Sequence, residues 1–344
     1  MRTKVTSAIK CSVYKPNSNA SDPFLGLQMT SLNLETVNKV EDDKKTTVFL
    51  LRTENRAKGV QALLKQFNLE ELKTKKIVLK ANYNSADAFP ASTHLETLRA
   101  LVSSLKAAGA NEITLAERSG MGNAQEVLRQ LGVSELLIKL KCKILVLDDL
   151  PEEGWVHFKP TGTHWKRGFL LAKIFKEADK VVQTCCLKTH RFGGHFTLSL
   201  KNSVGLVAKY DPKDEYNYMR ELHTSRAQRL MIAEINQTYA CPLVLLDAIE
   251  AFVSGGPESG ELIHPGVMLA GEDRVAIDAV GVAILRFFGT TPEVSRGRIF
   301  EQEQISRAAQ LGVGIKATQD IKLVPIGDES RDFARQIDEV LKLG

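Results

Sequence analysis

Residues 181–202, VVQTCCLKTHRFGGHFTLSLKN, join an apolar run to a turn rich in chemically active side chains. The apolar run at 181–186 is typical of a buried strand. Lys188, His190 and Lys201 follow it, and they offer fixed cations for an anion and an imidazole for proton transfer. Gly193 and Gly194 allow a sharp turn or the close approach of a ligand. This combination predicts a binding or active site directly after the strand.

Strand and helix patterns alternate on both sides of this stretch. Short apolar runs predict strands at 76–81, 112–116, 143–147, 180–186, 242–246, 267–270 and 321–324. Amphipathic or capped segments predict helices at 93–108, 124–131, 169–177, 225–238, 273–288, 302–311 and 332–343. The alternation predicts an α/β fold, with a mostly parallel sheet and helices on both of its faces. In such sheets, ligands bind at the carboxyl ends of the strands.

The domain organisation predicted from composition has two parts. Residues 1–45 are polar and are expected to form an N-terminal extension, and residues 46–344 form the α/β core. The irregular stretch at 151–167, with its prolines, glycines and histidines, resembles a hinge or lid. It leaves open a division of the core into two lobes, 46–150 and 167–344.

Composition and charge narrow the class of protein. The chain is 43% hydrophobic and 25% charged, which is ordinary for a globular protein. The net charge of +5 is small and dispersed, so no nucleic-acid partner is expected. The sequence contains no run of about 18 consecutive apolar residues, so no membrane span is expected. The N-terminus has no apolar segment of the signal-peptide kind, and a cytoplasmic location is therefore expected.

The five cysteines do not form a recognisable framework. They lie at positions 11, 142, 185, 186 and 241, with no CxxC spacing. The odd number and the spacing argue against a disulfide scaffold and against a self-contained zinc or iron–sulfur motif.

Polar residues follow several of the predicted strands and form one candidate site. The candidate catalytic residues are Lys188, His190 and Asp247, and the candidate ligand-binding residues are Lys80, Asn82, Glu117, Arg118, Ser119, Gly120, Lys201, Asn202, Gly255 and Gly256. Lys188 and Lys201 are predicted to hold a carboxylate or phosphate. His190 is the predicted general acid or base. The loop at 119–122 is a candidate for a second phosphate, since it precedes a helix.

Asp247 has two predicted roles, and its neighbours in sequence have structural alternatives. It could orient His190, or share a divalent metal with Glu250 or Asp273; the sequence does not identify the metal. Asp273 is also a natural N-cap for its helix. Arg274 and Asp278, four residues apart, suggest a structural ion pair. The remaining histidines at 157, 164, 223 and 264 are expected to be exposed loop residues.

A series of short motifs resembles the family called domain of unknown function 362. In order, the motifs are Leu79–Asn82, Thr93–His94, Ala116–Gly120, Leu187–His190, Thr197–Gly205, Asp247–Glu250, Gly255–Gly260 and Asp273–Gly281. Together they cover most of residues 46–290. Ala81 stands where the family has a proline, which leaves Asn82 in register. Some members carry a ferredoxin-like iron–sulfur module, and this chain lacks the clustered cysteines for one.

A second resemblance is local. His190–His195, followed by Lys201, is similar to a His/Phe/Gly-Gly/Lys segment of nickel-pincer lactate racemases. This resemblance implies a nickel–nucleotide cofactor held by a lysine and a histidine, and hydride transfer from a hydroxy acid.

Three functions therefore remain open. The first is an enzyme or binding protein for a small anionic metabolite, with a Lys/His/Asp cleft. The second is a non-catalytic accessory or redox-partner protein, related to iron–sulfur proteins. The third is a racemase-like enzyme with a metal or nucleotide cofactor. Sequence does not give the substrate, the reaction or the oligomeric state.

Overall fold

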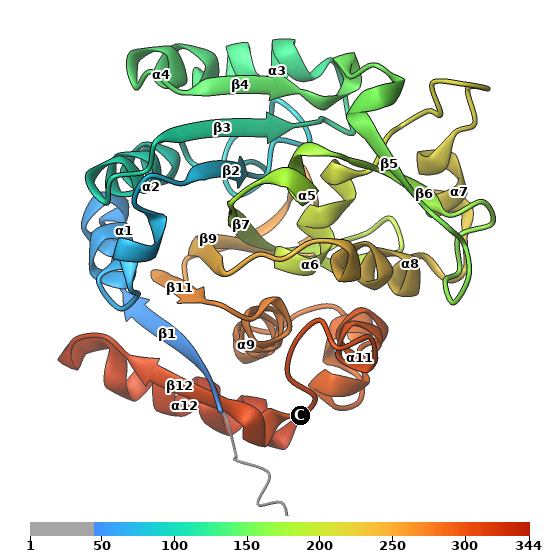
Figure 1. The fold of residues 1–344 in the computed structure, drawn as a ribbon. Coiled ribbons are helices and arrows are strands. Elements are labelled where there is room, and N and C mark those ends of the chain that lie inside the picture. Colours follow the sequence, from blue (N-terminus) through green and yellow to red (C-terminus); the bar gives the residue numbers. More distant parts are fainter. Residues whose placement is uncertain (1–44) are drawn as a thin grey trace, which may run out of the picture. The chain divides into compact units, whose positions relative to one another are not determined.

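A mixed ten-stranded sheet organises the chain in the computed structural model, which describes residues 45–344 (Figure 1). Its main strand order is β12-β1-β11-β9-β7-β2-β3-β4, with β10 paired to β9 and β8 paired to β7. Neighbours from β9 to β4 run parallel, whereas β11 is antiparallel to both β9 and β1. The predicted α/β class with a mostly parallel sheet is confirmed.

The elements have the following bounds. The strands of the large sheet are β1 (Thr46–Arg52), β2 (Lys76–Lys80), β3 (Glu112–Glu117), β4 (Lys143–Val146), β7 (Lys180–His190), β8 (His195–Thr197), β9 (Leu243–Gly255), β10 (Gly260–Ile263), β11 (Val267–Gly271) and β12 (Ile321–Pro325). The α-helices are α1 (Arg56–Leu64), α2 (Leu95–Ala107), α3 (Ala124–Gln130), α4 (Val133–Lys139), α5 (Ile174–Glu177), α6 (Ser199–Asn202), α7 (Tyr218–Thr224), α8 (Gln228–Ile235), α9 (Arg274–Phe287), α10 (Pro292–Ser295), α11 (Glu303–Gln310) and α12 (Arg331–Leu343).

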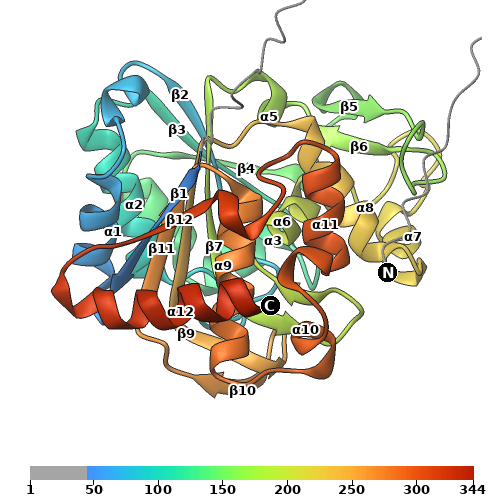
Figure 2. The same ribbon diagram turned by 90° about the horizontal axis from the view of Figure 1, so that it is seen from below.

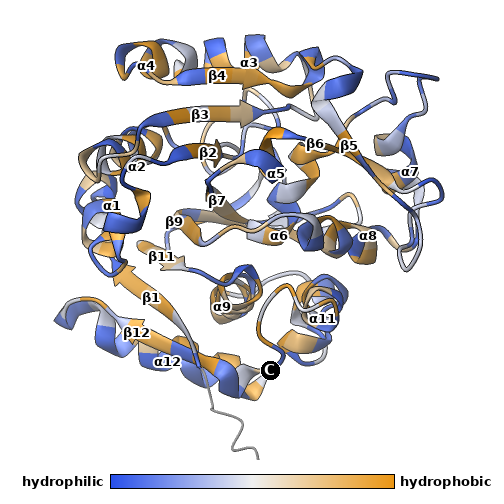
Figure 3. Ribbon diagram, viewed as in Figure 1, coloured by the Kyte–Doolittle hydropathy of each residue, from blue (hydrophilic) through white to orange (hydrophobic). Residues whose placement is uncertain are grey.

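Helices cover both faces of the sheet because successive strand residues point to opposite sides. Ile77 and Leu79 pack with the apolar residues of α1 to α4, whereas Val78 belongs to the core under α6, α8, α9, α11 and α12. Figure 3 shows apolar residues concentrated on the central strands and mixed with hydrophilic ones on α12. In Figure 2, α12 runs alongside β12 and α9.

The boundary expected at 151–167 does not separate two sheets. β1, from the expected first lobe, lies between β11 and β12 of the expected second lobe. The described residues, 45–344, belong to one compact unit. The irregular stretch instead contains β5 (Trp155–Phe158), which pairs with β6 (Phe169–Ala172) in a small antiparallel sheet. The expected N-terminal extension lies outside the described residues, except for Lys45.

The helix predicted at 169–177 is wrong in its first half. Phe169–Ala172 is a strand, and only Ile174–Glu177 is helical. All four residues of β6 are buried, and such a short apolar run fits a buried strand and a buried helix equally well by periodicity. Pairing with β5 makes this run a strand.

Two central strands are longer than predicted, and this changes where the candidate residues lie. β7 continues to His190 and β9 to Gly255, and the two stay paired beyond a register shift after Cys186. Lys188 and His190 are therefore part of a strand rather than of the loop after it. Two residues apart, they lie on the same face of that strand.

No helix among the described residues has both the length and the apolar character needed to span a bilayer.

Candidate functional site

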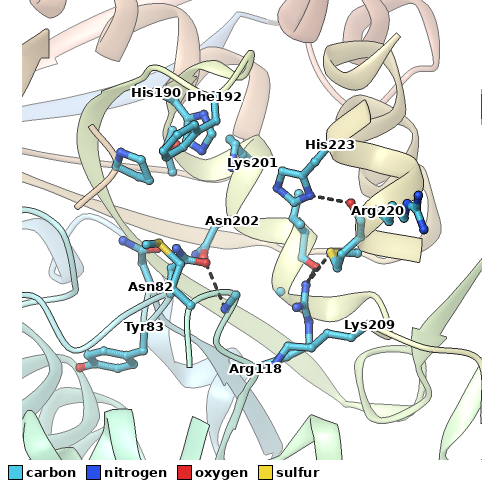
Figure 4. A pocket seen from close by; sticks show the side chains of 18 of the residues that line it. Asn82, Tyr83, Arg118, His190, Phe192, Lys201, Asn202, Lys209, Arg220 and His223 are labelled. Carbon is cyan, nitrogen blue, oxygen red and sulfur yellow. Dashed lines mark hydrogen bonds between the residues drawn. The ribbon is translucent and has the colours of Figure 1, made fainter. Parts of the chain in front are cut away.

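A cavity of about 610 Å³ opens where β2, β3 and β7 end and α6 and α7 approach them (Figure 4). Its polar lining comprises Lys80, Asn82, Tyr83, Asn84, Arg118, Lys188, His190, Thr197, Lys201, Asn202, Lys209, Asn217, Arg220, His223 and Thr224. Six of these side chains are cations, and none of the described lining residues is Asp or Glu. The half-exposed side chains of Met121, Phe192 and Tyr210 add apolar surface. The charge of the wall therefore favours a negatively charged ligand.

Two of the six cations are neutralised by carboxylates behind the wall. The Lys80 ammonium contacts the buried Glu117 carboxylate, the Ala81 carbonyl and Asn202 Oδ1. Burial lowers the pKa of Lys80, and the attraction of Glu117 opposes this shift. Lys209 Nζ lies 2.8 Å from Asp148 Oδ2. These two lysines therefore contribute less free positive charge than the others.

Arg118 has unused hydrogen-bonding capacity at the cavity. Its Nη2 donates to the Val204 carbonyl at 2.8 Å and contacts Met219 Sδ. Its Nε and Nη1 atoms are buried and have no hydrogen-bond partner among the described residues. An unpaired buried donor costs about 1–3 kcal/mol. An anion that accepted hydrogen bonds from Nε and Nη1 would therefore remove this cost.

Lys188 and Lys201 are the two other lysines of the wall, and neither pairs with a carboxylate of the described residues. The Lys188 ammonium donates to the Ala91 carbonyl, and burial lowers the pKa of Lys188 to about 8. Burial, followed by the charges of Lys188 and Arg118, lowers the pKa of Lys201 to about 7. Because these cations repel one another, an anion among them would favour the charged form of each.

Two histidines face the same cavity as Lys201, which lies between them in Figure 4. His190 is 6% exposed, and its Nδ1 has no hydrogen-bond partner within residues 45–344. Burial, then Lys201 and Lys188, lowers the pKa of His190 far below its usual value, which keeps the imidazole neutral. Burial also lowers the pKa of His223, whose Nδ1 lies 2.6 Å from the Met219 carbonyl oxygen.

The Gly-Gly turn brings these groups together. Gly193 adopts a left-handed φ of +80° in the hairpin between β7 and β8. At Gly194, a Cβ would lie 2.8 Å from Lys201 Cε and 2.9 Å from His190 Nδ1. Only a glycine lets both side chains approach at this point.

Asp278 holds the short helix that carries Lys201 and Asn202. Its Oδ1 accepts hydrogen bonds from the Ser199 backbone N–H at 2.8 Å and from the Ser199 hydroxyl. Burial raises the pKa of Asp278 to about 7. The expected ion-pair partner, Arg274, instead donates to Asn236 and to the Tyr239 carbonyl. The Asp278 carboxylate therefore fixes the start of α6 by these hydrogen bonds.

The family model described as "Domain of unknown function (DUF362)" matches residues 77–283. The chain belongs to this family. Every residue that lines the cavity falls within the matched segment. No curated protein matches the chain. Among solved structures, the lactate racemase apoprotein from Thermoanaerobacterium thermosaccharolyticum is similar, with 13% identity, coverage of 86% of this chain and 87% of that chain, and a TM-score of 0.41.

The structure brings most of the sequence-predicted residues to the cavity. Those that line it are Lys80, Asn82, Arg118, Gly120, Lys188, His190, Lys201 and Asn202. Glu117 and Ser119 lie buried behind the wall, where Glu117 pairs with Lys80 and the Ser119 hydroxyl donates to the Tyr83 carbonyl. Gly255 and Gly256 form the turn between β9 and β10, and only the following Pro257 reaches the cavity.

Asp247 does not line the cavity. Its Oδ2 atom accepts hydrogen bonds from Arg56 Nε at 3.0 Å and from the Thr97 hydroxyl, rather than from His190. The expectation failed because β9 runs on past Asp247, so this residue lies inside a strand and not at its end. Its carboxylate ties α1 and α2 to the sheet.

The residues predicted to bind a metal or a second phosphate hold the fold together instead. Asp273 caps α9 and accepts from the Ile315 N–H, and Glu250 lies 3.7 Å from His264. Within residues 45–344, no three His, Cys, Asp or Glu side chains form a metal-binding group. In the loop at 119–122, the N–H groups of residues 120 and 121 both donate to Asn84. They are already in use and are not free for a phosphate.

Sequence reasoning missed the wall contributed by residues 204–224. Lys209, Tyr210, Arg220 and His223 all line the cavity. His223 was expected to be an exposed loop residue; it is exposed, but it lies on α7 and lines the cavity. The signal that could have found this helix is its N-cap Asn217, whose side chain accepts from the Arg220 N–H.

Proposed function

We propose that this protein binds a small anionic metabolite, with a carboxylate or phosphate group, in the cavity at the ends of β2, β3 and β7, and acts on it as an enzyme. The observation that supports the proposal most strongly is the excess of positive charge on the cavity wall. Arg118, Lys188, Lys201 and Arg220 form no salt bridge with any described carboxylate, and no acidic side chain is among the described lining residues. Arg118 and Lys188 are buried, Lys201 is partly buried and Arg220 is exposed. A buried cation without a partner is costly, and a bound anion relieves that cost.

Unsatisfied polar atoms support the same proposal. Arg118 Nε and Nη1, His190 Nδ1 and Thr197 Oγ1 are all buried, belong to residues that line the cavity and lack partners in the described part of the chain. Buried polar groups in folded proteins are nearly always paired, so clusters of exceptions mark places where another molecule belongs. These atoms are donors or can be donors, which matches the oxygens of a carboxylate or phosphate.

Each residue then has a distinct role. Arg118 and Lys188 hold the anionic group, and Lys201 stands beside it. His190, neutral and next to Lys201, transfers a proton. Asn82 and Asn202 have their amides committed to Ala91, Thr184 and Lys80, so they shape the wall.

The test combines identification of any co-purified molecule with direct titration. The full chain is purified gently, and mass spectrometry identifies the small molecules it releases; inorganic phosphate and pyruvate are then titrated by calorimetry. Arg118→Met should weaken binding by about 10- to 100-fold, since a hydrogen bond to a charged group is worth about 1.5–3 kcal/mol. Lys139→Met, an exposed lysine of α4, serves as the control and should bind like the parent.

The same experiment separates the alternatives. An anionic metabolite retained by the parent chain and lost from Arg118→Met supports the proposal. A nickel-bearing nucleotide would favour the racemase-like alternative. Protein-bound iron with a visible absorbance band would favour the accessory or redox-partner role. A chain that carries nothing and binds neither phosphate nor pyruvate refutes the proposal.

A further inference from the structure

We infer that Lys201 is a nucleophile that forms a Schiff base with the carbonyl group of its anionic ligand. This inference rests on the proposed function and deepens it. It assigns the anionic group to Arg118 and Lys188, and the reacting carbonyl carbon to Lys201 Nζ. The substrate class is then an anionic carbonyl compound, either a 2-oxo acid or an aldehyde or ketone phosphate.

Elimination among the lysines of the wall points to Lys201. Four lysines line the cavity, at positions 80, 188, 201 and 209. Lys80 contacts Glu117, and Lys209 pairs with Asp148, so the ammonium group of each already has a carboxylate partner. Lys188 is 1% exposed and donates to the Ala91 carbonyl. Among the described contacts, Lys201 has neither a carboxylate nor a carbonyl acceptor, and it is partly exposed to the cavity.

The surroundings of Lys201 favour a neutral amine. Burial and the charges of Lys188 and Arg118 lower the pKa of Lys201 to about 7, which favours the unprotonated amine compared with an ordinary lysine. A lysine that is desolvated and placed next to other cations is the established physical route to an activated amine.

A proton carrier lies beside the amine. The Lys201 Cε and His190 Nδ1 atoms converge on the space that Gly194 leaves open. His190 Nδ1 is buried and, like the Thr197 hydroxyl of the same cavity, has no partner among the described residues. These atoms can relay a proton between the nitrogen and the oxygen of a bound carbonyl group.

The step balances without an oxidant or a reductant. The Lys201 nitrogen lone pair forms a bond to the carbonyl carbon, and the C=O π pair moves to oxygen, which takes up a proton. The nitrogen gives up a proton, which leaves a carbinolamine. Its hydroxyl then takes up a second proton while the nitrogen lone pair forms the C=N bond, so the C–O bond breaks with release of water and leaves a protonated imine. The resulting C=N bond withdraws electrons from the adjacent carbon, which prepares it for proton removal or bond cleavage.

The test traps the imine on the full chain with sodium borohydride. One arm uses pyruvate and the other glyceraldehyde 3-phosphate, so that a carboxylate source and a phosphate source are distinguished. Intact mass followed by peptide mapping should locate one reduced adduct on Lys201 in at least one arm. Lys201→Arg keeps the charge and lacks the nucleophile; it should give no adduct. Lys139→Arg should label like the parent.

Binding measurements separate this inference from the proposed function. Calorimetry with the same compounds, without borohydride, measures binding by the parent chain. Binding by the parent chain with no adduct on Lys201 in either arm overturns the inference and leaves the proposed function standing. An adduct in Lys201→Arg equal to that of the parent also overturns it. No binding of either compound by the parent chain overturns both.

Discussion

The substitution Gly194→Ala tests the convergence of Lys201 and His190 most sharply. An added Cβ would lie 2.8 Å from Lys201 Cε and 2.9 Å from His190 Nδ1, whereas comfortable contacts are about 3.5–4.0 Å. One or both side chains must therefore move by about 1 Å. Gly194 does not adopt a positive φ, so the backbone accepts alanine. The free energy of unfolding should change by no more than about 1 kcal/mol.

The functional effect should be much larger than the effect on stability. A displacement of about 1 Å in a reacting group typically reduces its rate by about 100-fold. The rate of borohydride-trapped adduct formation should fall by that order, while the melting temperature stays within a few degrees. Gly154→Ala is the matched control, because the atoms nearest its Cβ belong to Leu150, which does not line the cavity. Parent-like trapping in Gly194→Ala would refute the described convergence.

Four further predictions concern Glu117, Asp278 and Lys201. Glu117→Gln leaves Lys80 buried without its carboxylate and should lower the free energy of unfolding by about 3–5 kcal/mol in chemical denaturation, with part of the loss recovered in Glu117→Gln/Lys80→Met. Asp278→Ala releases the Ser199 N–H and should reduce both the melting temperature and anion affinity; loss of stability with unchanged affinity would contradict its role in placing α6. Because the pKa of Lys201 is lowered to about 7, the unfolded chain binds one more proton between about pH 7 and 10.5, so stability should rise with pH over that window and Lys201→Met should flatten the rise. Phosphate affinity should fall over about pH 7 to 8 as Lys201 loses its charge, a change that calorimetry at several pH values measures directly.

The groups that face Lys201 set the direction of this pH dependence. Lys188 and Arg118 repel its charge, and His190 and His223, both with lowered pKa values, add no compensating negative charge. No carboxylate among the described residues of the cavity wall stabilises the protonated form of Lys201. The pKa of Lys188 is also lowered, to about 8, so the dependence should weaken rather than vanish in Lys201→Arg, whose guanidinium stays protonated.

Much of the fold was predictable from local patterns. The apolar runs that became β2, β3, β4, β7 and β11 are short, bounded by polar turns and separated by amphipathic helices, which is the pattern of a parallel sheet. The antiparallel insertion of β11 between β9 and β1 was not predictable, because pairing across distant strands leaves no local signal. The same limit explains β6, whose continuous apolar run acquires its strand identity from β5.

The candidate site was predictable to the extent that its residues follow strands. Lys80, Arg118 and His190 come from three parallel strands whose carboxyl ends meet at one edge, and the rule for such sheets brings them together. The same rule gave a wrong prediction for Asp247, because β9 does not end at this polar residue but continues to Gly255. His223 was missed because α7 reaches the cavity only through tertiary packing.

The most direct test of the central claim is the position of a bound anion. A crystal of the full chain soaked in selenate, whose oxygens resemble those of phosphate, would locate the ion by the anomalous scattering of selenium. A peak within hydrogen-bond distance of Arg118, beside Lys188 and Lys201, is the predicted result. A cavity without a peak, in a crystal where selenate binds elsewhere on the protein, would contradict it.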